Sequence, residues 1–254
     1  MTRLAAGRGK IVYFLSSGPR EGRPSRDEPR TAHRTPGAHR RASDHVTNIP
    51  DHPAPVATRG STVNDRVYTH EFIDIIGANR PNYMHHMTAN WSPIAQEERN
   101  QLCFGVWGTV GTTGHWPQVV NMWEEAGFDG LAAGLGHELG RPTLQDEKLE
   151  KWWKEAANYR RGGFDRVLVP APWTRTIEEL CADSVKGVAY AHETVEVDPG
   201  GADDFLSAVR DQAVPTLAPF GWELGHGLGE PRPQLGAERC FLGGVAKVHG
   251  ISSA

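Results

Sequence analysis

Two short stretches of the sequence each place a tyrosine and a histidine two residues apart, and these side chains are the strongest candidates for chemistry. Tyr68 and His70 form one pair, and Tyr190 and His192 form the other. In a β-strand, residues two apart lie on the same face. Histidine titrates near neutral pH and can act as a general base, and a tyrosine hydroxyl can stabilise an oxyanion. We therefore predict a catalytic role for both Tyr/His pairs; the alternative is that they are interior polar groups packed under helices.

The rest of the sequence holds none of the patterns that mark common cofactor or metal sites. It contains no Walker loop and no GxGxxG, HExxH or GxSxG motif. The three cysteines, Cys103, Cys181 and Cys240, are widely spaced and form no CxxC pair. We predict no metal site, and the sequence requires no cofactor. Scattered, unpaired cysteines favour a reducing, cytoplasmic location.

The two Tyr/His stretches belong to a longer internal repeat. Residues 190–197 align with residues 68–75, matching Tyr, His and Glu outright and the acidic and β-branched positions by type. The register continues without a gap, so that Leu224 aligns with Leu102. Identity is only 6 of the 38 positions from 68 to 105, and the case rests on a strand, a helix face and a second strand staying in register. We therefore predict equivalent strands at Tyr68 and Tyr190.

Local patterns place these stretches in a succession of strands and helices. Residues 67–76 are rich in β-branched and aromatic residues, which predicts a strand. Residues 146–161 carry an apolar stripe and Glu-before-Lys pairs four apart, which predicts a helix that ends at Gly162 and Gly163. Further strands are expected at 102–110, 118–124 and 166–169, and further helices at 81–91, 128–138 and 176–181, the last with a capping box.

This succession predicts an α+β fold of tandem ferredoxin-like units whose sheets pack face to face in an arrangement of the dimeric α/β-barrel type. We expect a first unit at 63–173 with an extra helix at 146–161. A linker with a short helix is expected at 174–187, and a second unit at 188–254. The second unit is expected to be incomplete, because the chain ends before any counterpart of the second helix and fourth strand. Either the C-terminus is truncated or altered, or another chain covers its open edge, as in a homodimer.

Residues 1–62 differ in composition from the rest of the chain. They are rich in Arg, Pro, Gly and Ser with almost no apolar periodicity, which predicts a disordered N-terminal extension. They hold 11 Lys/Arg against 5 Asp/Glu, and because the whole chain carries −4, residues 63–254 carry −10. An acidic folded part repels phosphate backbones, so we expect no nucleic-acid partner. No apolar run approaches the about 20 residues that span a bilayer, so we expect no membrane partner.

One strand carries a family resemblance. Val119-Val-Asn-Met-Trp-Glu124, followed by an acidic turn and a helix, resembles the V-x-x-W-E strand of the NIPSNAP-like proteins, and the stretch beginning at Tyr68 resembles the opening strand of that family. The resemblance covers residues 67–138 and, in tandem form, 188–228. It implies the dimeric α/β-barrel superfamily and a cavity between two sheets. That superfamily uses the cavity for haem handling, cofactor-free oxygenation, isomerisation and roles without known chemistry.

We therefore expect a small-molecule-binding α/β-barrel protein. It would be a cofactor-independent oxygenase or isomerase, or a binder of haem or another hydrophobic ligand, and its partner would be a small hydrophobic or aromatic molecule. The alternative is a non-catalytic NIPSNAP-like interaction or structural module. Replacing His70 and His192 by Gln distinguishes the two, because under the alternative it affects stability alone.

Overall fold

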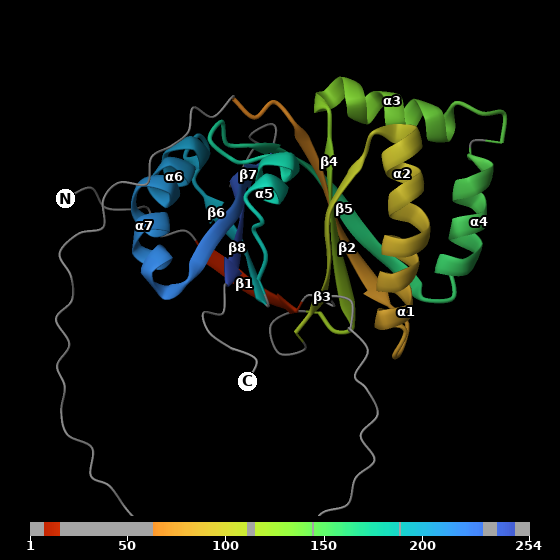
Figure 1. The fold of residues 1–254 in the computed structure, drawn as a ribbon, viewed down its shortest axis with the longest axis horizontal. Coiled ribbons are helices and arrows are strands. Elements are labelled where there is room, and N and C mark those ends of the chain that lie inside the picture. Colours follow the sequence, from red (N-terminus) through yellow and green to blue (C-terminus); the bar gives the residue numbers. More distant parts are fainter. Residues whose placement is uncertain are drawn as a thin grey trace, which may run out of the picture. The chain divides into compact units, whose positions relative to one another are not determined.

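The computed structural model describes residues 8–15, 63–110, 115–143, 145–187, 189–230 and 238–246, which form an α+β fold (Figure 1). Its strand pairs are all antiparallel. The strands are β1 (Arg8–Leu15), β2 (Val67–Ile75), β3 (Leu102–Thr109), β4 (Gln118–Glu125), β5 (Arg160–Pro170), β6 (Ala189–Val197), β7 (Trp222–Gly229) and β8 (Glu238–Ala246).

The strands pair in the order β1-β3-β4-β2-β5-β7-β8-β6 and close into a barrel. The barrel consists of two four-stranded sheets, β3-β4-β2-β5 and β7-β8-β6-β1, which meet at two short seams. One seam pairs Phe14 and Leu15 of β1 with β3, and the other pairs Val169 and Pro170 of β5 with β7. Because alternate residues of a strand point to opposite faces, one set of side chains from each sheet lies inside the barrel.

Helices lie outside the strands. They are α1 (Arg80–His85), the π-helical η1 (His86–Trp91), α2 (Ser92–Arg99), α3 (Gly127–Leu139), α4 (Glu147–Ala156), α5 (Ile177–Ala182), α6 (Ala202–Ala208), the π-helical η2 (Val209–Ala213), α7 (Val214–Leu217) and the 3-10 helix η3 (Ala218–Phe220). Figure 1 shows α1 and α2 beside the first sheet, with α4 beyond α2, and shows α6 and α7 beside the second sheet. Within the described residues, no helix has both the length and the apolar character that a membrane crossing requires.

The predicted strand at 190–197 is confirmed. β2 and β6 are offset by 122 residues at both ends, and each leads into a helical segment that contains a π-helical turn, η1 or η2. Two more strands follow in each case, and the second of them pairs with the opening strand. β2 and β6 therefore hold corresponding positions in their sheets.

The predicted disorder of residues 1–62 is wrong for Arg8–Leu15, which form β1. This strand pairs with β6 along its whole length, from Arg8 opposite Glu196 to Leu15 opposite Ala189. A short strand is stable only when a partner completes its hydrogen bonds. The partner here lies far away in the sequence, so local composition could not reveal it. The remaining residues of the predicted extension lie outside the described part of the chain.

The prediction that the second unit has an uncovered edge is also wrong. β6 is flanked by β8 and β1, just as β2 is flanked by β4 and β5. β1 thus occupies the place beside β6 that β5 occupies beside β2. Antiparallel pairing needs only that two segments lie side by side, so the strand that fills this place can come from the other end of the chain. A homodimer is not needed to cover this edge and stays a prediction.

The extra helix of the first sheet is α3 rather than α4. Leu149, Trp152 and Ala156 of α4 are buried in the core formed by β2, β4 and the helices that cover them, whereas α3 has no buried residue. Of these two helices, only α4 therefore contributes to this core. The predicted element at 146–161 takes the place that we expected for residues 128–138.

The predicted end of that helix is wrong as well. α4 ends at Ala156, and the two glycines expected to stop it lie within β5. A Cβ at Gly163 would lie 2.1 Å from the carbonyl oxygen of Phe72 in β2. Gly163 therefore permits close approach of two paired strands, a role that a glycine pair after a helical pattern does not reveal.

Candidate functional site

The structure brings two of the predicted site residues, His70 and His192, together inside the barrel. They extend from β2 and β6, and their imidazole rings stack with centroids 4.6 Å apart and planes 5° apart. Both side chains are buried, with exposed fractions of 0% and 3%. The corresponding strands of the two sheets thus place equivalent side chains against each other.

A third histidine extends this pair. The ring centroid of His226 in β7 lies 5.6 Å from that of His192, and His226 is also buried. His226 pairs directly with Gly243 of β8, where a Cβ would lie 2.1 Å from His226 Cε1. Gly243 therefore provides the space that the imidazole occupies. We call His70, His192 and His226 the histidine cluster.

Burial keeps the histidine cluster uncharged at neutral pH. Desolvation lowers the pKa of His70 and of His192 well below the usual value of an imidazole, and nearby histidines and Arg166 lower both further. Desolvation lowers the pKa of His226 to about 4. Among the described residues, the ring nitrogens of His70 and His226 have no hydrogen-bond partner. A neutral imidazole can donate through one nitrogen and accept through the other, so His226 is available to a ligand.

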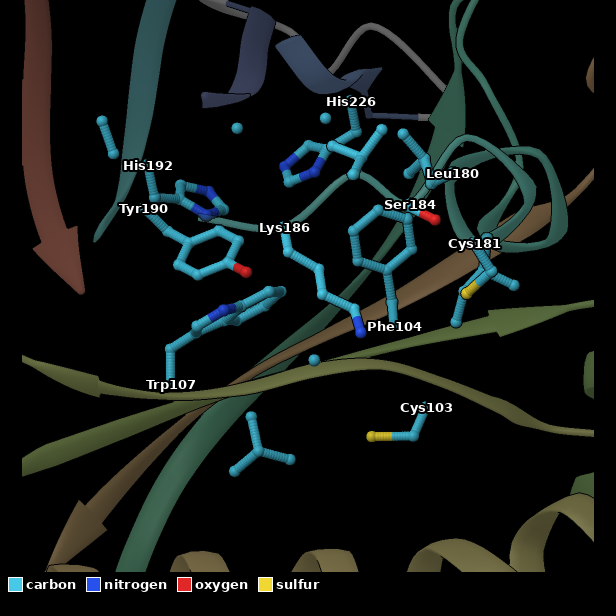
Figure 2. Close-up of a pocket in the computed structure, with 17 residues that line it drawn as sticks. Cys103, Phe104, Trp107, Leu180, Cys181, Ser184, Lys186, Tyr190, His192 and His226 are labelled. Atoms are coloured by element: carbon cyan, nitrogen blue, oxygen red, sulfur yellow. The ribbon is translucent and has the colours of Figure 1, made fainter. Parts of the chain in front are cut away.

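A pocket of about 310 Å³ lies against the cluster, between β3, β6 and β7 (Figure 2). His192 and His226 line it, whereas His70 does not. Its aromatic walls are formed by Phe104, Trp107 and Tyr190. The ring centroids of Trp107 and Tyr190 lie 5.6 Å apart, and those of Phe104 and His226 lie 5.5 Å apart. A volume of this size is at the lower end of the range for small-molecule sites, about 300–1,000 Å³.

One further segment lines the pocket. α5 and the residues that follow it contribute Ile177, Leu180, Cys181, Ser184, Val185 and Lys186 to the lining. We call residues 177–186 the pocket roof. The side chain of Lys186 is exposed and lines the pocket, and its ammonium group lies between Trp107 and Phe104 in the view of Figure 2. The predicted capping box that opens α5, Thr176 with Glu179, is confirmed.

The two predicted tyrosines lie in different surroundings. Tyr190 lines the pocket, and its hydroxyl accepts a hydrogen bond from the Gly187 N–H at 3.4 Å. Tyr68 is fully buried, donates to Glu124 Oε2 at 2.8 Å and accepts from Asn64 Nδ2 at 3.0 Å. Burial and the Glu124 carboxylate raise the pKa of Tyr68. Tyr68 thus belongs to an internal network and does not line the pocket, whereas Tyr190 does.

Metal-ligating side chains gather at another place. In the part of the chain that the structure describes, one group of three has donor atoms within 4.8 Å of one another, namely Glu98, His137 and Asp146. Arg99 and Arg141 lie 3.3 and 3.2 Å from the Asp146 carboxylate, and Lys148 pairs with Glu98. These cations already neutralise the carboxylates, so we assign no metal there. In the histidine cluster, the parallel rings of His70 and His192 do not direct their nitrogens at a common point, as a metal would require.

The pocket does not fit a haem, which is one of the ligands that the family resemblance implies. His226 carries ring nitrogens that could ligate an iron. A volume of about 310 Å³, however, suits a ligand much smaller than a tetrapyrrole. We therefore derive no chemistry through haem.

Sequence reasoning missed His226, Trp107 and the pocket roof. His226 lies 122 residues after Phe104, so the repeat aligns it with an apolar residue and not with a histidine. One signal was present, because Gly225 and Gly227 flank His226, and glycines within a strand mark the close approach of another group. The roof falls in the stretch predicted as a linker, and its role depends on tertiary position alone.

Comparison with known proteins gives similar structures but no matching sequence family. No family model and no curated protein matches the chain significantly. An uncharacterized NIPSNAP domain protein from Burkholderia xenovorans is 15% identical, with a TM-score of 0.36 over 43% of this chain and 99% of its own. A NIPSNAP-like domain protein from the same organism is 14% identical, with a TM-score of 0.36 over 44% of this chain and 90% of its own.

A candidate monooxygenase from Lactobacillus acidophilus NCFM is 9% identical, with a TM-score of 0.45 over 72% of this chain and 78% of its own. At such low identity these likenesses assign no reaction. Two of these similar structures are NIPSNAP domain proteins, the family that the strand motif of this sequence resembles.

Proposed function

We propose that this chain is a small-molecule-binding protein whose ligand is a small, planar and mostly apolar molecule held in the pocket beside the histidine cluster. The observation that carries the proposal is the lining of the pocket. Aromatic rings form its walls, two buried imidazoles lie at its inner side, and one exposed lysine also lines it. Pockets with mostly apolar walls and a few polar groups are typical of small-molecule sites.

We also infer that the chain consists of two ferredoxin-like units in tandem, which enclose the site as in a dimeric α/β-barrel. This architecture is consistent with a small-molecule site. The offset of 122 residues between β2 and β6, the π-helical turn in each half and the matching flanking strands support two units. β1 serves as the fourth strand of the second unit. The ligand would then lie where the inner faces of the two sheets meet.

The electrostatics favour ligand recognition over proton abstraction. A general base works best when its pKa is close to the working pH. Burial lowers the pKa of His226 to about 4, so its neutral imidazole is a weak base but a good hydrogen-bond partner. We therefore propose that His226 orients a ligand through a hydrogen bond, with Tyr190 and Trp107 in contact with its flat face.

Binding of a neutral and an anionic naphthalene tests this proposal. We expect isothermal titration calorimetry to detect 2-naphthol and naphthalene-2-sulfonate binding to the wild-type protein, and W107A to bind both at least tenfold more weakly, about 1.4 kcal/mol. The matched control is W153A, since Trp153 lies on α4 and does not line the pocket. K186Q should weaken the binding of naphthalene-2-sulfonate but not that of 2-naphthol, because only the sulfonate carries a negative charge that the lysine ammonium group attracts. Absence of binding to the wild type, or equal binding by W107A, would overturn the proposal.

The alternative of a non-catalytic interaction module makes a different prediction. Under that alternative, H70Q/H192Q lowers the melting temperature but the protein binds neither compound, before or after substitution. Under our proposal, this variant also binds 2-naphthol more weakly than the wild type does. The reason is that His192 lines the pocket and its imidazole stacks on that of His70.

A further inference from the structure

The glutamate of the V-x-x-W-E strand contacts the pocket roof. Glu124 in β4 is 1% exposed. Its Oε2 accepts hydrogen bonds from the Tyr68 hydroxyl at 2.8 Å and from the backbone N–H of Ile177 at 2.9 Å. Ile177 is the first residue of α5 and lines the pocket. One buried carboxylate therefore joins the barrel wall to the start of the roof.

Other bonds hold the chain just before the roof. The Thr174 carbonyl accepts from Asn64 Nδ2 at 3.0 Å, and the Thr174 hydroxyl donates to the Gly227 carbonyl at 2.7 Å. Asn64 Nδ2 also bonds the Tyr68 hydroxyl. The same network thus fixes the segment that leads into α5 from two sides. At the far end, the Gly187 N–H bond to Tyr190 is longer, at 3.4 Å.

We propose that Glu124 is a positioning residue that sets the placement of the pocket roof through its hydrogen bond to Ile177. The part of this inference that concerns affinity rests on the proposed function, whereas the part that concerns the roof does not. Loss of the bond leaves the remaining anchors in place but frees the first turn of α5 from the barrel wall. The roof residues then cover the pocket less tightly, and a bound ligand is released faster.

A neighbouring glutamate provides the matched control. Glu125 is 3% exposed, and its Oε1 accepts from Thr69 Oγ1 and Gln101 Nε2, both at 2.9 Å. Burial raises the pKa of both glutamates. Glu125 contacts no roof residue through these bonds. E124Q and E125Q therefore make the same chemical change, which replaces a charged carboxylate acceptor by a weaker, neutral amide oxygen. Only Glu124 touches the roof.

A second pair of variants tests the same bond from its other end. I177P removes the donor N–H and the side chain, whereas I177A removes the side chain alone. Proline suits the first position of a helix, and Thr176 has the extended conformation that precedes proline readily, with φ −73° and ψ 165°. This pair keeps the test available even if E124Q fails to fold.

Hydrogen–deuterium exchange measures the roof without any ligand. Two roof amides take part in backbone hydrogen bonds: Leu180 donates to the Thr176 carbonyl just before the roof, and Val185 donates to the Leu180 carbonyl. We expect their exchange to be at least tenfold faster in E124Q than in E125Q, and faster in I177P than in I177A, while exchange in β2 and β4 differs little within each pair. Equal exchange within both pairs would overturn the inference.

Binding of 2-naphthol separates this inference from the proposed function. We expect its affinity to fall at least threefold more in E124Q than in E125Q. If the wild type binds no naphthalene but the roof amides still exchange faster in E124Q and I177P, the proposed function fails and the positioning role stands. If the wild type binds and the exchange rates do not differ within the pairs, the positioning role fails and the proposed function stands.

Discussion

His70 and His192 stack face to face inside the barrel although 122 residues separate them in the sequence. Two parallel imidazoles whose centroids are 4.6 Å apart repel each other when both are charged. Desolvation acts in the same direction and is the larger cause of their lowered pKa values. The folded protein therefore holds the histidine cluster in its neutral form, which links the site to the stability of the fold.

Acid should weaken the fold through these histidines. In the unfolded chain an imidazole titrates near 6.5, whereas His226 in the fold has a pKa of about 4. The contribution of His226 to the free energy of unfolding is thus complete above pH 6.5 and is lost between pH 6.5 and about 4, by about 1.4 kcal/mol per pH unit. Urea unfolding at pH 7, 6 and 5 measures this loss.

The control for this prediction is H226F, which introduces the residue found at the aligned position, Phe104. Burial raises the pKa of Glu71 and Glu124, so their contribution to stability has the opposite pH dependence. This contribution is present in both the wild type and H226F, and the comparison of these two proteins cancels it. The unfolding free energy of wild type should fall more steeply with acid than that of H226F. Equal slopes would show that His226 is not a source of the acid sensitivity.

We expect a glycine at position 243 to be needed because it leaves room for the His226 ring, and not because the strand itself needs a glycine. In G243A the new Cβ would lie 2.1 Å from His226 Cε1, so the whole ring must move. We expect a loss of about 1–3 kcal/mol of unfolding free energy, as for other overpacked sites. In an H226A background the same substitution should cost little, and a double-mutant cycle measures the difference. G134A is the control, since nothing lies within 4 Å of the added Cβ there; equal costs in both backgrounds would contradict the prediction.

The sequence predicted the two equivalent opening strands because these depend on local composition and on a repeat that keeps its register. Tyr68 and Tyr190 satisfy the same pattern, yet only tertiary contacts decide that Tyr68 bonds Glu124 while Tyr190 lines the pocket. β1 was missed because its partner strand is distant in the sequence. The roles of α3 and α4 were exchanged because both have helical patterns, and which of them is buried is a property of the packed sheet.

α4 should contribute far more to stability than α3. Trp152 is 5% exposed and packs against the rings of His86 and Trp91, with centroids 5.1 and 5.7 Å away. W152A should lower the free energy of unfolding by about 3–5 kcal/mol, because it leaves a large cavity. Leu135 of α3 is 48% exposed, so L135A should change stability by less than about 1 kcal/mol. Chemical denaturation of both variants measures this; similar losses would mean that α3 also packs in the core.

Removal of β1 should open the edge of β6. A chain that lacks residues 1–15 loses the whole β1–β6 pairing and the seam to β3. Exposed strand edges recruit other strands, so we expect a lower melting temperature and association in size-exclusion chromatography. A synthetic peptide of residues 6–17 should restore the melting temperature in a concentration-dependent way, because it binds the folded state alone. The same peptide with both Ile11→Pro and Val12→Pro should not, because alternate residues of an antiparallel strand donate to the same neighbour, so one of these two N–H groups belongs to the ladder with β6. A truncated chain as stable and monomeric as the full chain would show that β1 does not hold the barrel closed.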